Sequence, residues 1–310
     1  MNVPTRGRTV AAITFATALA LVLLFVWPGF LSRDRLESAE GSVIFQGRDE
    51  TGYGIFAVDA DGANLRQVDI PIARSVGFPR YSPDGRRIAF VAEAEDGSED
   101  LYVADSGGGN PRSIAPSPSE PEGAPAWSPD GRLIAFSSRR NGNWEIYTVR
   151  PDGTELRQIT FDEAAVDAAP SWSPDGTRLA FGSDRGGGDS HLYVMNADGS
   201  GVRQLTSAGD EQAPDWSPDG RFIAYVAFTG GNADIWVAEE DGTHARRLTR
   251  GERFEYTPRW SPDGLWIAYE AYIEEFPDIF LMRPDGSADR RLTHRGSYAG
   301  APSWRPALPR

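Results

Sequence analysis

The chain has 310 residues, with 31 basic and 45 acidic side chains, and its net charge at pH 7 is -14. This charge opposes binding to nucleic acid or to anionic lipid through the body of the protein, and it favours basic or cationic partners. Cysteine is absent and all 31 basic residues are arginine, so disulfides, thiolate metal sites, a cysteine nucleophile and a lysine Schiff base are excluded.

The N-terminal segment has the properties of a membrane anchor. Residues 9–31 carry no charge and are mostly apolar, long enough at about 1.5 Å per residue to cross a hydrocarbon layer of roughly 30 Å. Arg6 and Arg8 precede this segment, which predicts that residues 1–8 are cytoplasmic, that 9–31 form a transmembrane helix, and that 32–41 are a linker outside the membrane. A cleaved signal peptide is the alternative. Both place the rest of the chain in an extracytoplasmic space, and the anchor makes it a single-pass protein of the cytoplasmic (inner) membrane.

One signature recurs after the linker. It consists of an aromatic residue, Ser-Pro-Asp-Gly, two variable residues, and then Ile or Leu, Ala, and Phe or Tyr. Successive aromatic leaders are 44 to 46 residues apart, and a period of this size is typical of repeated supersecondary units. The copies are Tyr81–Phe90, Trp127–Phe136, Trp172–Phe181, Trp216–Tyr225 and Trp260–Tyr269, with a shortened copy at Trp304.

Each period contains four strand signals. Between Pro125 and Pro170 these are Ala126-Trp127, residues 133–137, residues 145–149 and residues 156–160. Pro presets φ in the turn after the first strand, and Gly tolerates positive φ, so Ser-Pro-Asp-Gly predicts a tight hairpin. The repeats begin on a second strand and end on a first strand. The sequence therefore predicts an all-β, six-bladed β-propeller over residues 42–306, with four-stranded blades and one blade shared by the N- and C-terminal strands.

The repeats resemble a known family. The segments Pro214 to Tyr225 and Asp189 to Thr206 are similar to the TolB-like β-propeller repeats, and the resemblance covers residues 42–306. It implies a propeller and is consistent with a cell-envelope location, because the protein after which the family is named is periplasmic. The ten residues of the linker leave no room for the mixed α/β domain that precedes the propeller in that protein.

The repeated polar and aromatic residues could form a site. The turn aspartates could be a ring of metal ligands, and the tryptophans could be a stacking platform for sugars, but their presence in every copy favours roles in the turns and in packing between blades. The three histidines, His191, His244 and His294, fall at different places in their repeats and predict no common metal site. Asp59 to Gly62 resembles part of a calcium loop but lacks the bidentate Glu and the remaining ligand spacing, so it is interpreted as a hairpin turn. No cofactor is expected, and Ca²⁺ is kept as a candidate.

The acidic residues gather on one predicted face. Loops between second and third strands and loops between blades share one end of the ring, and they hold 25 acids and 8 arginines. We expect this end to bind a basic protein segment or a divalent cation, with aromatic residues as apolar anchors. The candidate residues are Glu93, Glu95, Asp96, Glu99, Asp100, Phe254, Tyr256, Glu270, Tyr272, Glu274, Glu275, Phe276 and Asp278.

The sequence thus predicts a membrane-tethered, extracytoplasmic, non-catalytic scaffold that binds a protein partner. The alternative is a carbohydrate- or peptide-processing enzyme with its site at the mouth of the propeller channel. The two differ in one respect: a functional channel should gather unlike residues that break the repeat. The visible exceptions, Tyr81 in place of Trp and the additional Trp266, lie at or next to hairpin turns and are interpreted as structural.

Overall fold

The computed structural model describes residues 41–50, 52–71, 75–93, 97–117, 120–294 and 296–306. The predicted cytoplasmic segment, transmembrane helix and linker lie outside the described residues, except for Gly41. Within the described part of the chain, no helix is long and apolar enough to cross a membrane.

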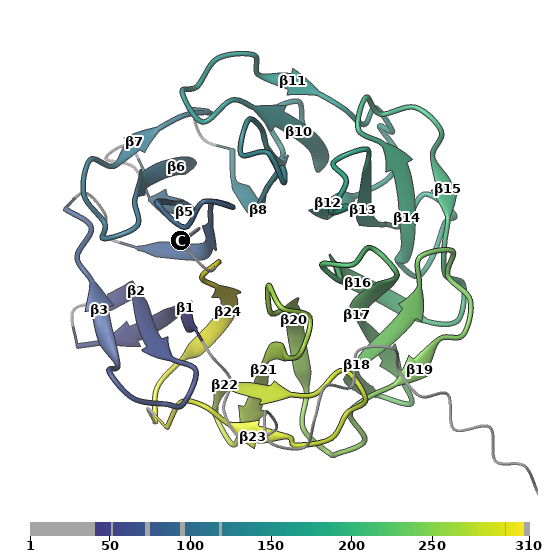
Figure 1. Cartoon of the computed structure of the whole chain (residues 1–310). Coiled ribbons are helices and arrows are strands. Elements are labelled where there is room, and N and C mark those ends of the chain that lie inside the picture. The colour runs from purple at the N-terminus through teal and green to yellow at the C-terminus, as the bar shows by residue number, and fades with distance from the viewer. Residues whose placement is uncertain are drawn as a thin grey trace, which may run out of the picture. The chain divides into compact units, whose positions relative to one another are not determined.

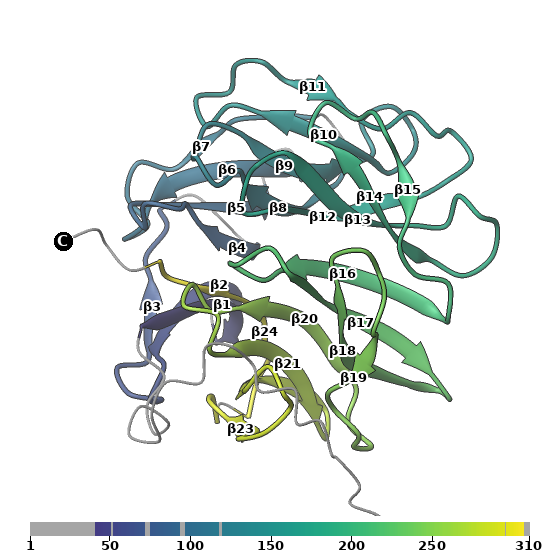
Figure 2. The ribbon, with the colours of Figure 1, turned by 45° about the vertical axis from the view of Figure 1, so that its right-hand side comes forward.

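The described residues form six antiparallel sheets of four strands each, arranged as blades around a central axis (Figure 1). The first strands surround the axis, and the fourth strands lie at the circumference. The blades are seen obliquely in Figure 2. The first strands are β4 (Val76–Tyr81), β8 (Glu122–Trp127), β12 (Asp167–Trp172), β16 (Asp210–Trp216), β20 (Glu255–Trp260) and β24 (Ala299–Trp304). The second strands are β1 (Ser42–Asp49), β5 (Arg87–Glu93), β9 (Ile134–Ser138), β13 (Arg178–Ser183), β17 (Phe222–Thr229) and β21 (Ile267–Ile273).

The third strands are as long as the second strands, whereas the fourth strands have only two or three residues. The third strands are β2 (Gly52–Asp59), β6 (Glu99–Asp105), β10 (Glu145–Val149), β14 (His191–Asn196), β18 (Asn232–Glu239) and β22 (Phe276–Met282). The fourth strands are β3 (Arg66–Val68), β7 (Arg112–Ser113), β11 (Arg157–Gln158), β15 (Arg203–Gln204), β19 (Arg246–Arg247) and β23 (Arg290–Arg291). The predicted six-bladed, all-β architecture is confirmed.

The predicted closure of the ring is also confirmed. The C-terminal strand β24 pairs antiparallel with the N-terminal strand β1, in a register that sets Trp304 opposite Val43 and Ala299 opposite Gly47. The order β24-β1-β2-β3 makes one blade from both ends of the propeller. This pairing covers an edge of β1 that would otherwise be open to association with other chains.

The Ser-Pro-Asp-Gly segments form tight hairpins between first and second strands. In the fourth copy, Ser217 Oγ accepts a hydrogen bond from Phe222 N (2.9 Å) and donates one to Asp219 Oδ1 (2.6 Å). Gly220 has a φ of 74°, in the left-handed region that glycine enters without a steric cost. The serine hydrogen bond also holds the pKa of the equivalent carboxyl, Asp175, at about 2. Each of these aspartates therefore stabilises its own turn.

Aromatic pairs fill the blades and tryptophans join them. The aromatic residue of each second strand is fully buried, as for Phe181, whose ring stacks on Tyr193 of the third strand at 5.9 Å between centroids. The tryptophans that precede the turns are also buried. Trp127 Nε1 donates to Arg80 O of the neighbouring blade (3.1 Å), so the tryptophans pack between blades as predicted.

Candidate functional site

A β-bulge near the end of every first strand determines which side chains face the central channel. In β4 the pairing with β5 shifts register between Gly77 and Arg80, and equivalent shifts occur in all six blades. The first of the two residues inside each shift has a left-handed backbone, which is uncommon for residues other than glycine. These residues are Phe78, Ala124, Ala169, Ala213, Thr257 and Ala301, with φ between 47° and 53°. A bulge of this kind changes the direction of the following side chains.

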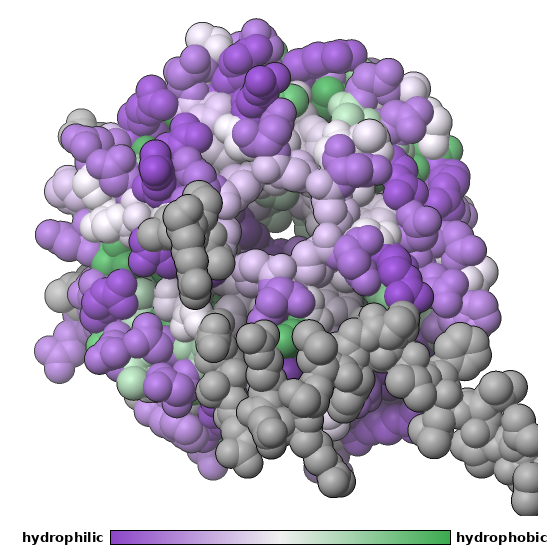
Figure 3. All heavy atoms as spheres, viewed as in Figure 1, coloured by the Kyte–Doolittle hydropathy of each residue, from purple (hydrophilic) through white to green (hydrophobic). Residues whose placement is uncertain are grey.

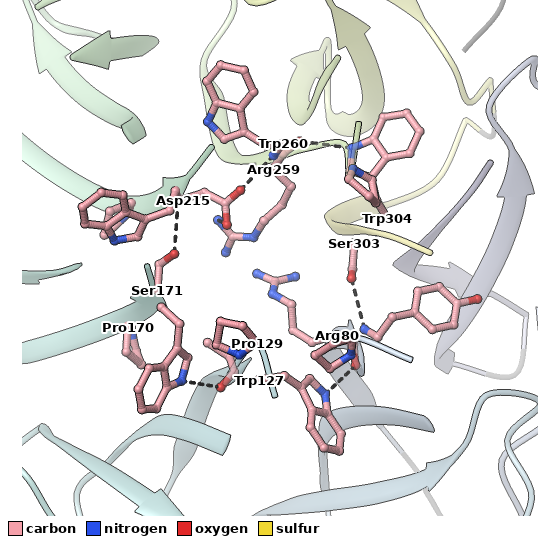
Figure 4. A pocket seen from close by; sticks show the side chains of 17 residues that line it. Arg80, Trp127, Pro129, Pro170, Ser171, Asp215, Arg259, Trp260, Ser303 and Trp304 are labelled. Atoms are coloured by element: carbon pink, nitrogen blue, oxygen red, sulfur yellow. Dashed lines mark hydrogen bonds and ion pairs between the residues drawn. The ribbon is translucent and has the colours of Figure 1, made fainter. Parts of the chain in front are cut away.

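The residue before each aromatic leader consequently lines a cavity of about 220 Å³ at the end of the channel where the Ser-Pro-Asp-Gly turns lie (Figure 4). Figure 3 shows a hollow at the centre of the ring within a largely hydrophilic surface. The aromatic leaders and turn prolines, including Pro83, Pro129 and Pro262, form the wall of the cavity. The six channel residues are Arg80, Ala126, Ser171, Asp215, Arg259 and Ser303.

Two of these six residues are arginines whose side chains converge. Figure 4 shows the guanidinium groups of Arg80 and Arg259 extending toward each other from opposite sides of the Ser303 strand. Arg80 Nη1 donates to the carbonyls of Pro79 and Pro302, both at 3.0 Å, and Arg259 Nη1 donates to Pro258 O at 2.7 Å. Backbone carbonyls therefore hold both guanidinium groups in place.

Asp215 lies beside the arginines without forming a close pair. Its Oδ1 is 3.9 Å from Arg259 Nη1, too far for a hydrogen bond, and its Oδ2 accepts from Trp260 N at 2.8 Å. Arg259 Nε is buried and has no hydrogen-bond partner among the described residues. Ser171 and Ser303 use their hydroxyls to accept from Trp216 N (3.3 Å) and Tyr81 N (3.2 Å).

Burial dominates the electrostatics of this group. It lowers the pKa of Arg80 well below its usual value, and the neighbouring Arg259 lowers it further. Burial also lowers the pKa of Arg259, and it raises the pKa values of Asp215 and of Glu270. The two carboxyls thus resist ionisation, and the two cations are close to each other in a poorly solvated site.

Three of the acids predicted for the docking face are buried. Glu270 Oε2 accepts from Ala301 N of the next blade at 2.7 Å. Asp100 accepts from Ser117 N at 3.0 Å, and Asp278 is bonded to Thr293 Oγ1 and to Arg291. The expectation that these carboxylates are available at the surface is therefore corrected. Their hydrogen bonds hold segments of the fold together.

The remaining predicted residues divide between two blades. Glu99 is exposed and Glu93 is half-buried in the β5–β6 blade, while Glu95 and Asp96 lie outside the described residues. Glu274 and Glu275 are exposed at the tip of the β21–β22 hairpin, where Phe276 is half-buried. The blade that closes the ring separates the two groups, so the acids do not form one continuous cluster.

The predicted aromatic residues form part of a larger group. Tyr256 contacts Tyr272 edge-on, with 5.9 Å between ring centroids, and Tyr256 also lies 5.9 Å from Phe228. Tyr53 and Tyr298 form a second edge-on pair at 5.6 Å, and Phe254 is 43% exposed. Phe228, Tyr53 and Tyr298 were not predicted, because they are distant in sequence and come from three different hairpins or loops.

The channel residues were also missed. Their signal is present in the sequence, since the position before the aromatic leader changes from Arg to Ala, Ser and Asp while the residues around it repeat. Tyr81 and Trp266 depart from the repeat more visibly, and both were interpreted as structural. The residues at the position before the leader vary from blade to blade, as is expected of residues that line a functional channel.

The described residues contain no group of three or more His, Asp or Glu side chains placed to hold a metal ion. His191 Nδ1 instead lies 2.7 Å from Glu211 Oε2, and His244 is largely exposed beside Glu239. In the calcium-like segment, Asp59 Oδ2 accepts from Asn64 Nδ2 at 2.6 Å, an arrangement of a hairpin turn.

Comparison with known proteins identifies relatives of this propeller. The TolB beta propeller domain family matches residues 42–227 and 207–308. The structure of TolB from Acinetobacter baumannii is 26% identical, with a TM-score of 0.75 over 86% of this chain and 67% of that chain. A putative TolB from Agrobacterium tumefaciens is 24% identical, with a TM-score of 0.65 over 84% and 91%.

More distant similarity extends to proteins of other kinds. An oligogalacturonate lyase from Vibrio parahaemolyticus is 17% identical, with a TM-score of 0.53 over 82% of this chain and 73% of that chain, a likeness of fold alone. No match was found among curated proteins. With family matches that span the whole ring, the chain belongs to the TolB β-propeller domain family.

Proposed function

We propose that this protein is an extracytoplasmic binding propeller, tethered to the cytoplasmic membrane through residues 9–31, that binds a protein partner and performs no catalysis. The binding surface is the loop end of the ring, opposite the Ser-Pro-Asp-Gly turns. The observation that supports this proposal is the aromatic group around Tyr256 beside the exposed Glu274 and Glu275.

Aromatic side chains of this kind are suited to anchor a partner. Tyrosine presents a large rigid surface and a hydroxyl, and it is enriched among the residues that contribute most to protein interfaces. Tyr53 and Phe254 are 38% and 43% exposed, which leaves apolar surface available, while Tyr256 and Tyr272 support each other by ring contact.

The charges predict the chemistry of the partner. Glu274 and Glu275 are exposed next to the aromatic group, and the whole chain has a net charge of -14. A basic segment would be attracted to these carboxylates during the approach, while its apolar residues would cover the rings. The resulting association should weaken at high ionic strength.

The test uses the full-length protein in membranes and a variant that combines Phe254→Ala with Glu274→Gln and Glu275→Gln. Proteins cross-linked to each form would be identified by quantitative mass spectrometry at low and high salt. We expect one partner to be lost from the triple variant and retained with the control Glu155→Gln, an exposed acid at the turn end of another blade. Retention of every partner by the triple variant would contradict the proposed surface.

Tethering is tested separately. The wild-type protein should sediment with membranes and retain residues 1–31, and removal of this segment should release the propeller from the membrane. A soluble wild-type protein that begins after residue 31 would instead identify a cleaved signal peptide.

The channel supports a second candidate, an enzyme that acts on carbohydrate or peptide. Arg80, Asp215 and Arg259 are the unlike residues that such a site would require. The serines beside them accept hydrogen bonds from backbone N–H groups of the next blade, and no histidine lines the cavity. This arrangement is better suited to binding an anion than to activating a nucleophile.

A further inference from the structure

The repeat does not require an arginine at the two positions occupied by Arg80 and Arg259. Four of the six equivalent positions hold Ala, Ser or Asp, and the same bulge forms in all six blades. Arg80 and Arg259 come from the two blades that flank β24, whose small Ser303 leaves space between them. Both side chains extend into the cavity (Figure 4).

Their hydrogen-bonding capacity is only partly used. The backbone carbonyls of Pro79, Pro258 and Pro302 engage one nitrogen of each guanidinium group, Nη1. Arg259 Nε, by contrast, is buried without a hydrogen-bond partner among the described residues. A guanidinium group presents five N–H donors in a planar fork, so both arginines retain donors for an acceptor in the cavity.

The local charge favours an anionic ligand. Asp215 and Glu270 balance the two arginines formally, but neither forms a close pair with them, and burial disfavours their ionised forms. A negative charge between the arginines would relieve their mutual repulsion. A planar carboxylate also matches the guanidinium fork in geometry.

We propose that Arg80 and Arg259 form a carboxylate-binding site at the turn end of the channel. The cavity of about 220 Å³ is smaller than the roughly 300–1,000 Å³ typical of sites for larger organic ligands, so it fits a small carboxylic acid or the C-terminal carboxylate of a peptide. The aromatic leaders and prolines around the opening would contact the apolar part of either ligand. This site is independent of the proposed protein-binding loops, which lie at the other end of the ring.

The experiment is isothermal titration calorimetry with the purified full-length protein and four probes. Propionate represents a free acid, N-acetylglycine represents a chain terminus, N-acetylglycinamide is its uncharged counterpart, and inorganic phosphate is a competing anion. We expect binding of the two carboxylates, with no binding of the amide and weaker binding of phosphate. Tighter binding of N-acetylglycine than of propionate would identify a chain terminus as the source of the carboxylate, and the reverse would identify a free acid.

Variants assign the binding to the channel. Arg80→Gln and Arg259→Gln should each weaken carboxylate binding at least 10-fold, while Arg132→Gln, which removes a largely exposed arginine on a turn, should leave it unchanged. Asp215→Asn should strengthen binding, because it removes a competing carboxyl group without removing a donor. This increase keeps the test decisive if an arginine variant fails to fold. Tighter binding of phosphate, equal binding by folded arginine variants, or no gain in Asp215→Asn would overturn the proposal.

Discussion

Glu255 should make the stability of the propeller depend on pH in a predictable direction. The side chain is fully buried at the start of β20, where it accepts from Thr249 Oγ1 at 3.0 Å, and burial raises its pKa from 4.5 to about 7. Between these values the folded protein holds a proton that the unfolded chain has released. Stability is therefore greatest below about pH 4.5 as far as this group is concerned, and it falls as the pH rises through 7. At about 1.4 kcal/mol per pKa unit, the loss amounts to about 3 kcal/mol.

Replacement by glutamine isolates this contribution. Glu255→Gln should resemble the wild type at pH 5 and should be more stable than it by about 3 kcal/mol at pH 8, because no charge has to be buried. The free energy of unfolding in urea at pH 5, 6, 7 and 8 measures the effect, and Glu252→Gln, an exposed acid nearby, is the control. Glu122, whose pKa burial also raises to about 7, contributes equally to all these proteins and cancels in the comparison. Identical pH dependence in wild type and Glu255→Gln would refute the reasoning.

Three further predictions concern the fold. Ser217→Ala removes the hydroxyl that bonds to Phe222 N, and urea denaturation should show a loss of about 1–3 kcal/mol; an unchanged midpoint would show that water replaces it. Phe181→Ala should cost about 3–5 kcal/mol in the same assay because the ring is fully buried, whereas Phe161→Ala, at 74% exposure, should cost less than about 0.5 kcal/mol. Deletion of Ala299–Trp304 uncovers the edge of β1, and size-exclusion chromatography should show aggregates; a monomer with cooperative unfolding would contradict the role assigned to ring closure.

The architecture was predictable because its causes are local and repeated. Each Ser-Pro-Asp-Gly segment contains its own turn-forming residues, and the second strands carry similar apolar sequences. Each of the five near-identical copies therefore predicts the same blade structure. Closure followed from the strand types at the two ends of the repeat region. The structure adds the exact pairing, such as Val43 opposite Trp304, which depends on the bulge in β24.

The site was less predictable because it depends on bulges and on contacts between blades. Alternation along a strand gives the two faces of a regular sheet, but the bulge at Phe78 alters which face Arg80 occupies. A proline follows the bulge residue in all six blades, as Pro79 does here, but proline alone does not specify a bulge.

The prediction that Glu270 and Asp278 are available at the surface was wrong for a related reason. Both acids lie in segments whose sequences predict polar loops. In the structure both are buried and accept hydrogen bonds from other segments, Glu270 from Ala301 N of the next blade and Asp278 from Thr293 Oγ1.

At three junctions between blades, the residue at the channel position contributes its main-chain carbonyl. Trp127 Nε1 donates to Arg80 O, Trp172 Nε1 to Ala126 O, and Trp304 Nε1 to Arg259 O, so the same contact between blades forms whether the acceptor residue is Arg or Ala. The side chain at this position faces the channel, and where it is Ser or Asp it also joins blades, because Ser171, Asp215 and Ser303 accept from backbone N–H groups of the next blade. Sequence change there alters the chemistry of the cavity, and each junction keeps a hydrogen bond either to the main-chain carbonyl or to the side chain at this position. In this propeller the repeat therefore maintains the ring, and the residue before each aromatic leader is where the channel acquires its charge.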